Sequence, residues 1–424
     1  MKARILYLCY FSLREPLVQT QVLPYLRQIV SDNLKVEILT FEPNLKEAWS
    51  EEQIQDEKNN LLAQGIIWHF LPYHKSPSVP ATIYDVFNGA RYIIKLSKEE
   101  RIDVFHARAH VAAMMGAMAK KAIGGKLLFD IRGFIPEEYT DAGIWKENGI
   151  VFKAVKRAEK TLLKISDAFV VLTERAREIL FPESFNTGFD KFGRSVEVIP
   201  CCVDLERFKS ASDCLEKEIA RRFNLENRFV ITYVGSFGGW YMTDEMLRFL
   251  SFVRQQKPET FALILTQRET EKVEAQLIEQ GFRKSDFFVG SVAPADIPSY
   301  LNASDIAISF IKACYSKQAS SPTKVAEYLA SGLPVISNSG VGDLDALIEG
   351  ENVGVILDGF SEKDFGRALQ KIEQLLGCPD LKNRCRKTAA EKFDLEKVGG
   401  ERYRRLYEKI LPALVNEKSG GKLV

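Results

Sequence analysis

Apolar runs rich in β-branched residues alternate along the chain with longer stretches that carry apolar side chains on one helical face. Six or seven such runs form each of two series, and helical patterns such as 84–98 and 153–165 fill the gaps. The strands expected in the two series are 4–11, 35–41, 66–72, 103–107, 126–131, 168–172 and 196–200, then 229–235, 261–266, 287–289, 305–310, 334–337 and 354–357. This alternation predicts an α/β protein with two doubly wound, Rossmann-like parallel sheets.

The break between the two series falls in the polar, charged stretch 202–227, as expected for a linker and a lead-in helix. With 424 residues the chain is long enough for two domains of ordinary size. We therefore predict an N-terminal domain over 1–205, a second domain over 206–394 and a terminal segment over 395–424. Because ligands bind beyond the carboxyl ends of parallel strands, two such domains facing each other would form a ligand cleft.

The segment 304–338 carries the most informative chemistry. Ser321 is expected as the N-cap of a helix, Pro322 as its first residue, and Gly332 as its end. Lys324 then lies in the first turn, where the helix dipole disfavours a cation by about 0.3–1 kcal/mol. A bound anion would reverse that sign, with Ser321 and Thr323 adding hydroxyl and N–H donors. Glu327, one turn later, could accept hydrogen bonds from sugar hydroxyls, so the pattern indicates a nucleoside diphosphate site.

Two further candidates for this site follow strands of the second series. Gly235-Ser236 opens a glycine-rich loop that would let the backbone approach a phosphate or sugar; the plain alternative is an ordinary flexible βα turn. Arg268 follows the strand 261–266 and could meet phosphate charge or be a solvated side chain. For Lys324 and Glu327 the plain alternative is an i,i+3 surface ion pair.

Five landmarks then occur in the order of a known family: PLVQTQVLPYL at 16–26, FDIRGF at 129–134, VLT at 171–173, VIPCCVD at 198–204 and YVGSF at 233–237. Together with 304–338 they resemble the family 4 glycosyltransferases, retaining enzymes of the GT-B fold, in a bacterial polysaccharide-type subgroup. The chain departs from that pattern twice. Ala319 stands where many members carry a first glutamate eight residues before Glu327, and 239–242 lacks the usual lysine or arginine.

The resemblance implies transfer of a sugar from a nucleoside diphosphate sugar to a glycan or lipid-linked acceptor in bacterial surface polysaccharide assembly. It also implies a hexosyltransferase without cofactor or essential metal, and a terminal helix, about 395–415, that returns to the N-terminal domain. Asp130 and Arg132 would join Lys324 as catalytic residues, with Gln21, Arg108 and Gly133 on the acceptor side. Three alternatives stay open: a structural Asp130–Arg132 pair, a 2-epimerase-like GT-B enzyme, and a non-catalytic GT-B partner subunit.

Composition narrows the function further. Fifty-eight basic against 57 acidic residues argues against a nucleic-acid binder that relies on overall charge. Seven scattered cysteines without a CxxC favour a reducing, cytoplasmic setting, and no apolar run approaches the length of a membrane span. No GxGxxG follows the first strand, which argues against a Rossmann oxidoreductase. His106 and His110 are four residues apart, but a strand end followed by a loop gives no metal-binding geometry.

Lysines and arginines gather in the second half of the N-terminal domain. Along 151–165 they alternate with apolar residues, which predicts a basic amphipathic helix. The cations concerned are Lys120, Lys121, Lys126, Lys153, Lys156, Arg157, Lys160 and Lys164. Such a helix is either a solvated face or a surface for anionic lipid or a lipid diphosphate, which would place the protein peripherally on the inner face of the plasma membrane.

Overall fold

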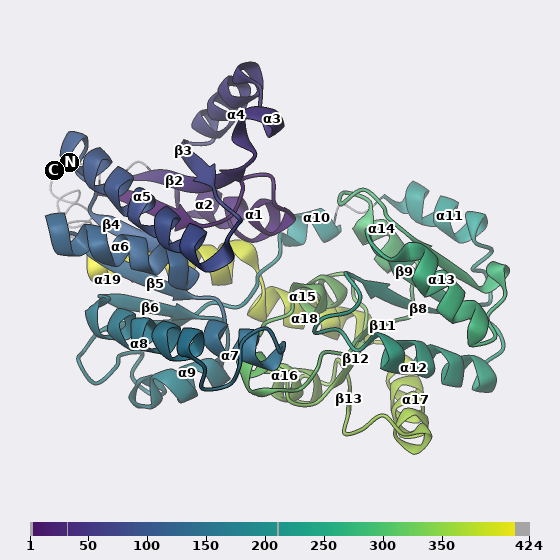
Figure 1. The fold of residues 1–424 in the computed structure, drawn as a ribbon. Coiled ribbons are helices and arrows are strands. Elements are labelled where there is room, and N and C mark those ends of the chain that lie inside the picture. Colours follow the sequence, from purple (N-terminus) through teal and green to yellow (C-terminus); the bar gives the residue numbers. More distant parts are fainter. Residues whose placement is uncertain (1–2, 32, 210–211, 412–424) are drawn as a thin grey trace, which may run out of the picture. The chain divides into compact units, whose positions relative to one another are not determined.

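The computed structural model describes residues 3–31, 33–209 and 212–411. The chain divides into two compact units, unit 1 from Met1–Pro200 with Leu395–Val424 and unit 2 from Cys201–Asp394. The first boundary lies five residues before the one expected at 205, and the second coincides with the expected start of the terminal segment. Each unit has its own parallel sheet with helices (Figure 1).

The described part of unit 1 contains a seven-stranded sheet in the order β3-β2-β1-β4-β5-β6-β7, and every pairing is parallel. Its strands are β1 (Ala3–Cys9), β2 (Leu34–Pro43), β3 (Ile66–Tyr73), β4 (Val104–Arg108), β5 (Lys126–Ile131), β6 (Ala168–Val171) and β7 (Ser195–Val198). The central strands are buried on both faces, which explains why they appear in the sequence as continuous apolar runs.

Helices of unit 1 follow most strands as crossover connections. They are α1 (Pro16–Gln21), α2 (Leu23–Ile29), α3 (Leu45–Ala48), α4 (Glu51–Ala63), α5 (Ser78–Glu99), α6 (Ala109–Ile123), α7 (Ile135–Asp141), α8 (Ile150–Ile165), α9 (Glu174–Leu180), a 3-10 turn (Pro182–Ser184), a π-helix (Leu395–Gly400) and α19 (Glu401–Ile410). Helix α5 begins six residues before the expected position 84, because Pro80 lies in its first turn, where a missing N–H costs nothing. Residues 412–415 of the expected terminal helix lie outside the described residues.

Unit 2, as far as it is described, contains a six-stranded parallel sheet in the order β10-β9-β8-β11-β12-β13. Its strands are β8 (Phe229–Val234), β9 (Thr260–Leu265), β10 (Phe287–Gly290), β11 (Ile306–Ser309), β12 (Val335–Asn338) and β13 (Gly354–Leu357). Its helices are α10 (Leu205–Lys209), α11 (Asp213–Arg222), α12 (Thr243–Gln256), α13 (Thr270–Glu279), α14 (Ile297–Asn302), α15 (Thr323–Ala330), α16 (Leu344–Gly350), α17 (Glu362–Leu376) and α18 (Leu381–Lys392), with 3-10 turns at Lys284–Asp286 and Tyr315–Ala319. The prediction of two α/β sheets is confirmed.

Alternate residues of the unit 2 strands belong to different apolar clusters. Ile231 and Ile264 pack with α12, α13 and α17, whereas Ala307 and Val335 pack with α15, α16 and α18. The strand order changes direction between β8 and β11 in unit 2, and between β1 and β4 in unit 1. Such switch points are where open α/β sheets bind ligands. Within the described residues, no helix is both long enough and apolar enough to cross a membrane.

Candidate active site

Two loops meet at the switch point of unit 2. The loop after β8 and the segment after β11 are joined because the Lys312 N–H donates to the Trp240 carbonyl (2.8 Å) and the Met242 N–H donates to the Phe310 carbonyl (3.1 Å). Asn338, at the end of β12, accepts from the Ile311 N–H at 2.8 Å and donates to the Ile311 carbonyl at 2.9 Å. These hydrogen bonds fix the loops after β8 and β11 to each other and to the end of β12.

The helix after β11 begins one residue later than the sequence indicated. Helix α15 starts at Thr323, Pro322 occupies the N-cap position, and no side chain caps it. The expected N-cap, Ser321, instead accepts a hydrogen bond from the Cys201 N–H at 3.1 Å. Pro322 has an extended ψ of 112° and therefore lies before the first helical residue. The first-turn N–H groups of α15 are therefore left without a side-chain cap.

Lys324 is the second residue of α15, and its side chain turns inward. The residue is only 8% exposed, and its Nζ donates to the Tyr233 hydroxyl at 3.0 Å. The same Nζ lies 4.2 Å from the ring centre of Tyr233 and 3.9 Å from that of Tyr241, so two aromatic faces enclose the amine. Burial lowers the pKa of Lys324 to about 7, despite the opposing effect of Glu327.

Gly235 is required for this approach of the amine. A side chain at Gly235 would place its Cβ 2.8 Å from Lys324 Nζ, and its φ of 137° disfavours any other residue. Tyr233 also donates its hydroxyl to the carbonyl of Ser236, so the loop and the lysine share one partner. The fold thus brings together three residues that the sequence indicated separately, Gly235, Ser236 and Lys324.

Glu327 lies one turn along α15 from Lys324, with 15% of its side chain exposed. No described ion pair joins the two residues, so the alternative of a simple surface pair is wrong. Arg207 of α10 approaches Glu327 instead, with Nη1 3.8 Å from Oε1. Burial raises the pKa of Glu327, and Arg207 and Lys324 oppose that shift.

Four residues at this edge were missed in the sequence. Tyr233, Tyr241 and Arg207 surround Lys324 and Glu327, as described above. The fourth, Lys317, is 7% exposed, and its Nζ lies 4.0 Å from the ring centre of Trp240. The sequence places Lys317 close to Lys324. It does not reveal that Lys317 is buried against the loop that carries Trp240, about 77 residues upstream.

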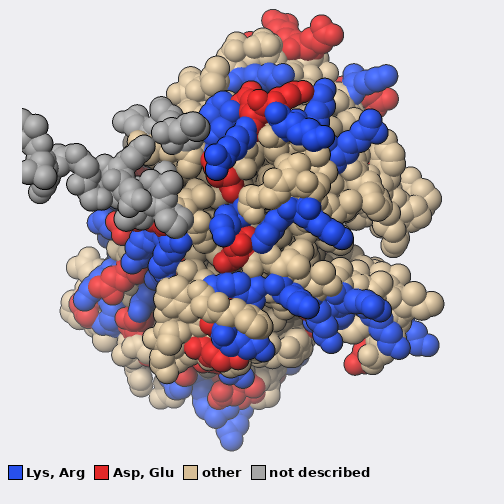
Figure 2. All heavy atoms as spheres, turned by 90° about the vertical axis from the view of Figure 1, so that its left-hand side faces the viewer, with Lys and Arg blue, Asp and Glu red and all other residues tan. Residues whose placement is uncertain are grey.

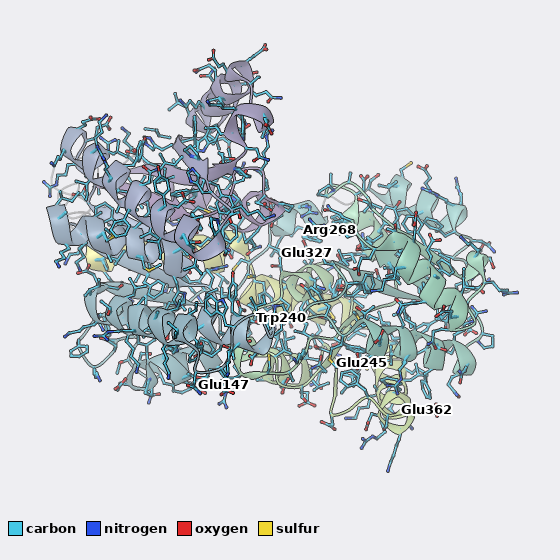
Figure 3. The ribbon with its side chains drawn as sticks, viewed as in Figure 1. Glu147, Trp240, Glu245, Arg268, Glu327 and Glu362 are labelled. Carbon is cyan, nitrogen blue, oxygen red and sulfur yellow. The ribbon has the colours of Figure 1, made fainter. Side chains whose placement is uncertain are left out.

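Arg268 is exposed, and its backbone is held in a turn in which Thr266 Oγ1 donates to the Arg268 carbonyl at 3.1 Å. Arg268, Glu327 and Trp240 lie along one edge of unit 2 (Figure 3). An exposed arginine at this edge can reach toward a ligand, in contrast to the enclosed Lys324.

Unit 1 contains a second polar centre around the end of β5. Asp130 is fully buried and lies 3.5 Å from Arg132 Nη1 and 3.5 Å from His106 Nε2. The Tyr403 hydroxyl of α19 donates to Asp130 Oδ2 at 3.0 Å, and His106 Nδ1 lies 2.6 Å from the Tyr407 hydroxyl. Asp130 and Arg132 are thus an ion pair that also anchors the terminal helix.

The surroundings of this centre favour an ionised Asp130 and a neutral His106. Burial raises the pKa of Asp130, but Arg132, His106 and Arg108 outweigh it and hold the pKa at about 2. Burial lowers the pKa of His106, although Asp130 opposes that shift. An ionised carboxylate therefore accepts a hydrogen bond from the Tyr403 hydroxyl and lies 3.5 Å from the His106 imidazole, which burial favours in its neutral form.

The remaining acceptor-side candidates surround this centre. Arg108 is 4% exposed, and its Nη1 approaches the carbonyl of Gln21 at 3.4 Å. A Cβ at Gly133 would lie 3.2 Å from Glu138 Oε1, so this glycine keeps the turn after β5 close to α7. The expectation that His110 lies in a loop is wrong, since His110 is the second residue of α6 and pairs with Glu159 at 2.9 Å.

No group of three or more His, Cys, Asp or Glu among the described residues could hold a metal ion. Cys9, Cys214, Cys314, Cys378 and Cys385 are free thiols.

Comparison with known proteins identifies part of the chain. The family model of the glycosyl transferases group 1 matches residues 216–392, which lie within unit 2 and include Gly235, Lys324 and Glu327. Residues 216–392 are therefore similar to the glycosyl transferases group 1. No curated protein matches the chain.

Solved structures extend the similarity beyond residues 216–392. A glycosyltransferase from Rickettsia africae is 16% identical with a TM-score of 0.71, covering 97% of this chain and 99% of that one. Anabaena HepE in complex with UDP is 15% identical (TM-score 0.67; 96% and 100% covered). WaaG, a glycosyltransferase involved in lipopolysaccharide biosynthesis, is 13% identical (TM-score 0.61; 96% and 99% covered). With its two parallel sheets, the chain has the GT-B fold.

Proposed function

We propose that the protein is a glycosyltransferase that takes its sugar from a nucleoside diphosphate sugar bound at Lys324. The observation that carries this proposal is a buried lysine at a switch point, with no carboxylate in ion-pair contact among the described residues. A buried charge without a partner is costly, so the site is built for an anion that arrives with the substrate. The similarity of residues 216–392 to the glycosyl transferases group 1 and the UDP-glucose complex of HepE support a nucleotide sugar as that substrate.

In this proposal each group has one task. Lys324, the segment Ser321-Pro322 and the uncapped first turn of α15, which begins at Thr323, meet the diphosphate. Glu327 accepts the ribose hydroxyls, and Gly235 with Ser236 lets the loop backbone approach the donor. Arg268 and the buried Lys317 supply further positive charge, which compensates for the missing lysine or arginine at 239–242.

The proposed chemistry is transfer with retention of configuration. The bond between the anomeric carbon and the diphosphate breaks, negative charge grows on the leaving oxygen, and the acceptor oxygen bonds to that carbon while its proton passes to the leaving group. Lys324 stabilises the departing charge without a metal ion or cofactor. Asp130 and Arg132, with Gln21, Arg108 and Gly133, are proposed on the acceptor side, where the pair would position the loop after β5.

For the acceptor we propose a glycan or lipid-linked glycan in bacterial surface polysaccharide assembly, with the enzyme in the cytoplasm. This pathway rests on the resemblance of the five landmarks and on the lipopolysaccharide role named for WaaG. The free thiols of Cys9, Cys214, Cys314, Cys378 and Cys385 are compatible with a reducing compartment.

The decisive experiment is a thermal-shift screen of UDP-, GDP-, ADP- and CMP-sugars, followed by calorimetry with the best ligand. We expect one nucleotide class to raise the melting temperature of the wild type. The variant Lys324→Ala should lose that shift, and the exposed Lys272→Ala should keep it. Equal shifts in both variants would refute the donor site.

Product analysis then separates the remaining classes of protein. A transferase consumes donor only with an acceptor or slowly with water, whereas a 2-epimerase releases free sugar nucleotide of changed configuration. A non-catalytic GT-B partner would bind donor and leave it unchanged under both conditions.

A further inference from the structure

An apolar groove lies on unit 1 between α5, α6 and α8. Its cavity measures about 390 Å³, within the range of sites for small ligands. Helices α5 and α6 pack along each other, and α6 packs on α8 (Figure 1). The lining residues are Thr82, Ile83, Val86, Phe87, Met114, Ala117, Met118, Ala158, Thr161, Leu162 and Ile165. Nearly all of these side chains are apolar, so the groove fits a hydrocarbon ligand better than a sugar.

The α5 wall of the groove leaves large apolar side chains in solvent. Phe87 is 60% exposed, Ile83 52% and Val79 45%, and these three residues are spaced four apart on one helix face. A contiguous apolar patch of this kind on a soluble protein marks a binding surface.

A stripe of cations borders the same groove on α8. Lys153, Arg157, Lys160 and Lys164 are all exposed and follow the spacing i, i+4, i+7, i+11, on the helix face next to the lining residues. No ion pair among the described residues includes any of these four. By contrast, Lys156, on the flank of the stripe turned away from the lining residues, is paired with Glu137 at 2.8 Å and with Glu159 at 2.5 Å.

We propose that this groove holds one acyl chain of an anionic membrane lipid, whose phosphate lies on the basic stripe of α8. An amphiphile with a hydrocarbon chain and an anionic head matches both halves of the surface, the groove and the stripe. The chain as a whole carries a net charge of only +1, so attraction to an anionic surface must come from a local concentration of cations. Bands of lysine and arginine, with uncharged and acidic residues between them, are visible on the side of the molecule that lies on the left in Figure 1 (Figure 2).

The proposal differs from simple adhesion of a basic helix to a membrane. It requires a chain inside the groove, and it does not depend on the donor site in unit 2. Its failure would therefore leave the proposed transferase activity untouched, and the reverse also holds.

The first arm of the test is sedimentation with phosphatidylglycerol and with phosphatidylcholine vesicles. We expect binding to the anionic vesicles at least about tenfold above the neutral ones, with release as salt rises. Reversing Lys153→Glu and Lys160→Glu should abolish it. The matched control reverses two exposed lysines of unit 2, Lys272→Glu and Lys363→Glu, and should bind like the wild type.

The second arm tests the groove without changing charge. Ile83→Ser with Phe87→Ser removes exposed apolar area and should weaken vesicle binding about tenfold, whereas Leu62→Ser, an equally exposed site on α4, should not. Ala117→Phe fills the groove from α6. By calorimetry, monomeric dodecyl phosphate should bind the wild type and not the filled variant, and inorganic phosphate should bind neither.

Thermal unfolding of every variant is the control that checks whether the fold is kept. Vesicle binding that survives both the serine pair and Ala117→Phe would reduce the surface to electrostatic adhesion and overturn the proposal. A dimer in light scattering that Phe87→Ser dissociates would mean that a second copy covers the groove, and this also overturns it.

Discussion

The two units contain buried charges of opposite character at the carboxyl edge of a parallel sheet. In unit 1 the carboxylate of Asp130 is surrounded by Arg132, His106 and Tyr403, so its charge is compensated inside the protein. In unit 2 the amine of Lys324 meets one hydroxyl and two aromatic faces. Removing one partner of a compensated buried pair destabilises the fold, whereas an uncompensated buried charge can be compensated by a bound ligand.

The largest expected effect is on the free energy of unfolding, and it is expected for a substitution at Asp130. Asp130→Asn removes the charge that pairs with Arg132 and should lower the free energy of unfolding by about 3–5 kcal/mol, as for other broken buried pairs. Chemical denaturation measures this change. Nucleotide binding by folded protein should be unaffected, and a variant as stable as the wild type would mean that the pair is not structural.

Lys324 should behave in the opposite way. Lys324→Ala should weaken nucleoside diphosphate binding about 10- to 100-fold in calorimetry, since one charge-assisted contact contributes about 1.5–3 kcal/mol. Its melting temperature without ligand should stay equal or rise, because a buried amine without a carboxylate partner is removed. Unchanged affinity, with Lys272→Ala as reference, would contradict the assignment.

The pH dependence of binding gives a smaller effect, up to tenfold per pH unit. The pKa of Lys324 is held at about 7 in the free protein, so above pH 7 a proton must be taken up when the diphosphate binds. The affinity of the wild type for a nucleotide sugar should fall as pH rises above 7, while Lys324→Arg, which stays charged, should show a flat profile. Parallel profiles for the two proteins would refute this coupling.

The same shift affects stability with the opposite trend. A lysine with a folded-state pKa near 7 and an unfolded value near 10.4 leaves more protons on the unfolded chain between those limits. Stability from this group should therefore rise with pH from about 7 to about 10.4. The difference in unfolding free energy between the wild type and Lys324→Met, followed across that window, isolates the contribution, and a constant difference would contradict it.

A few-fold effect is expected at Gly235. A Cβ there would lie 2.8 Å from Lys324 Nζ, so Gly235→Ala should displace the flexible amine and weaken nucleotide binding several-fold. Gly238→Ala is the matched control, because Gly238 also has a positive φ but has open space around its Cβ position. If both variants bind equally, backbone strain and not displacement of the lysine explains the change.

The smallest expected effect is that of chelation. Donor binding after EDTA treatment should match that of untreated protein, because Lys324 and Lys317 are proposed to take the place of a metal ion. Binding that is lost and then restored by magnesium or manganese would require a different account of the phosphate site.

The sequence alone was sufficient for both sheets and for the helix that carries Lys324 and Glu327. Central parallel strands are buried on both faces and helices on one, so period and apolar length distinguish them without tertiary information. Local chemistry also indicated the glycine at 235 and the lysine at 324 as parts of one kind of site. The predicted start of this helix was wrong by one residue, because the Ser321 hydroxyl accepts a hydrogen bond from the distant Cys201 N–H and does not cap the helix.

Tertiary structure alone decided which charges are compensated. Tyr403 reaches Asp130 across 273 positions, and Tyr233 reaches Lys324 across 91, and neither pairing leaves a local trace in the sequence. The groove on unit 1 likewise requires α5, α6 and α8 to be packed before its apolar lining becomes a cavity. Burial and partner choice depend on contacts between distant segments, whereas strand and helix patterns depend on neighbours along the chain.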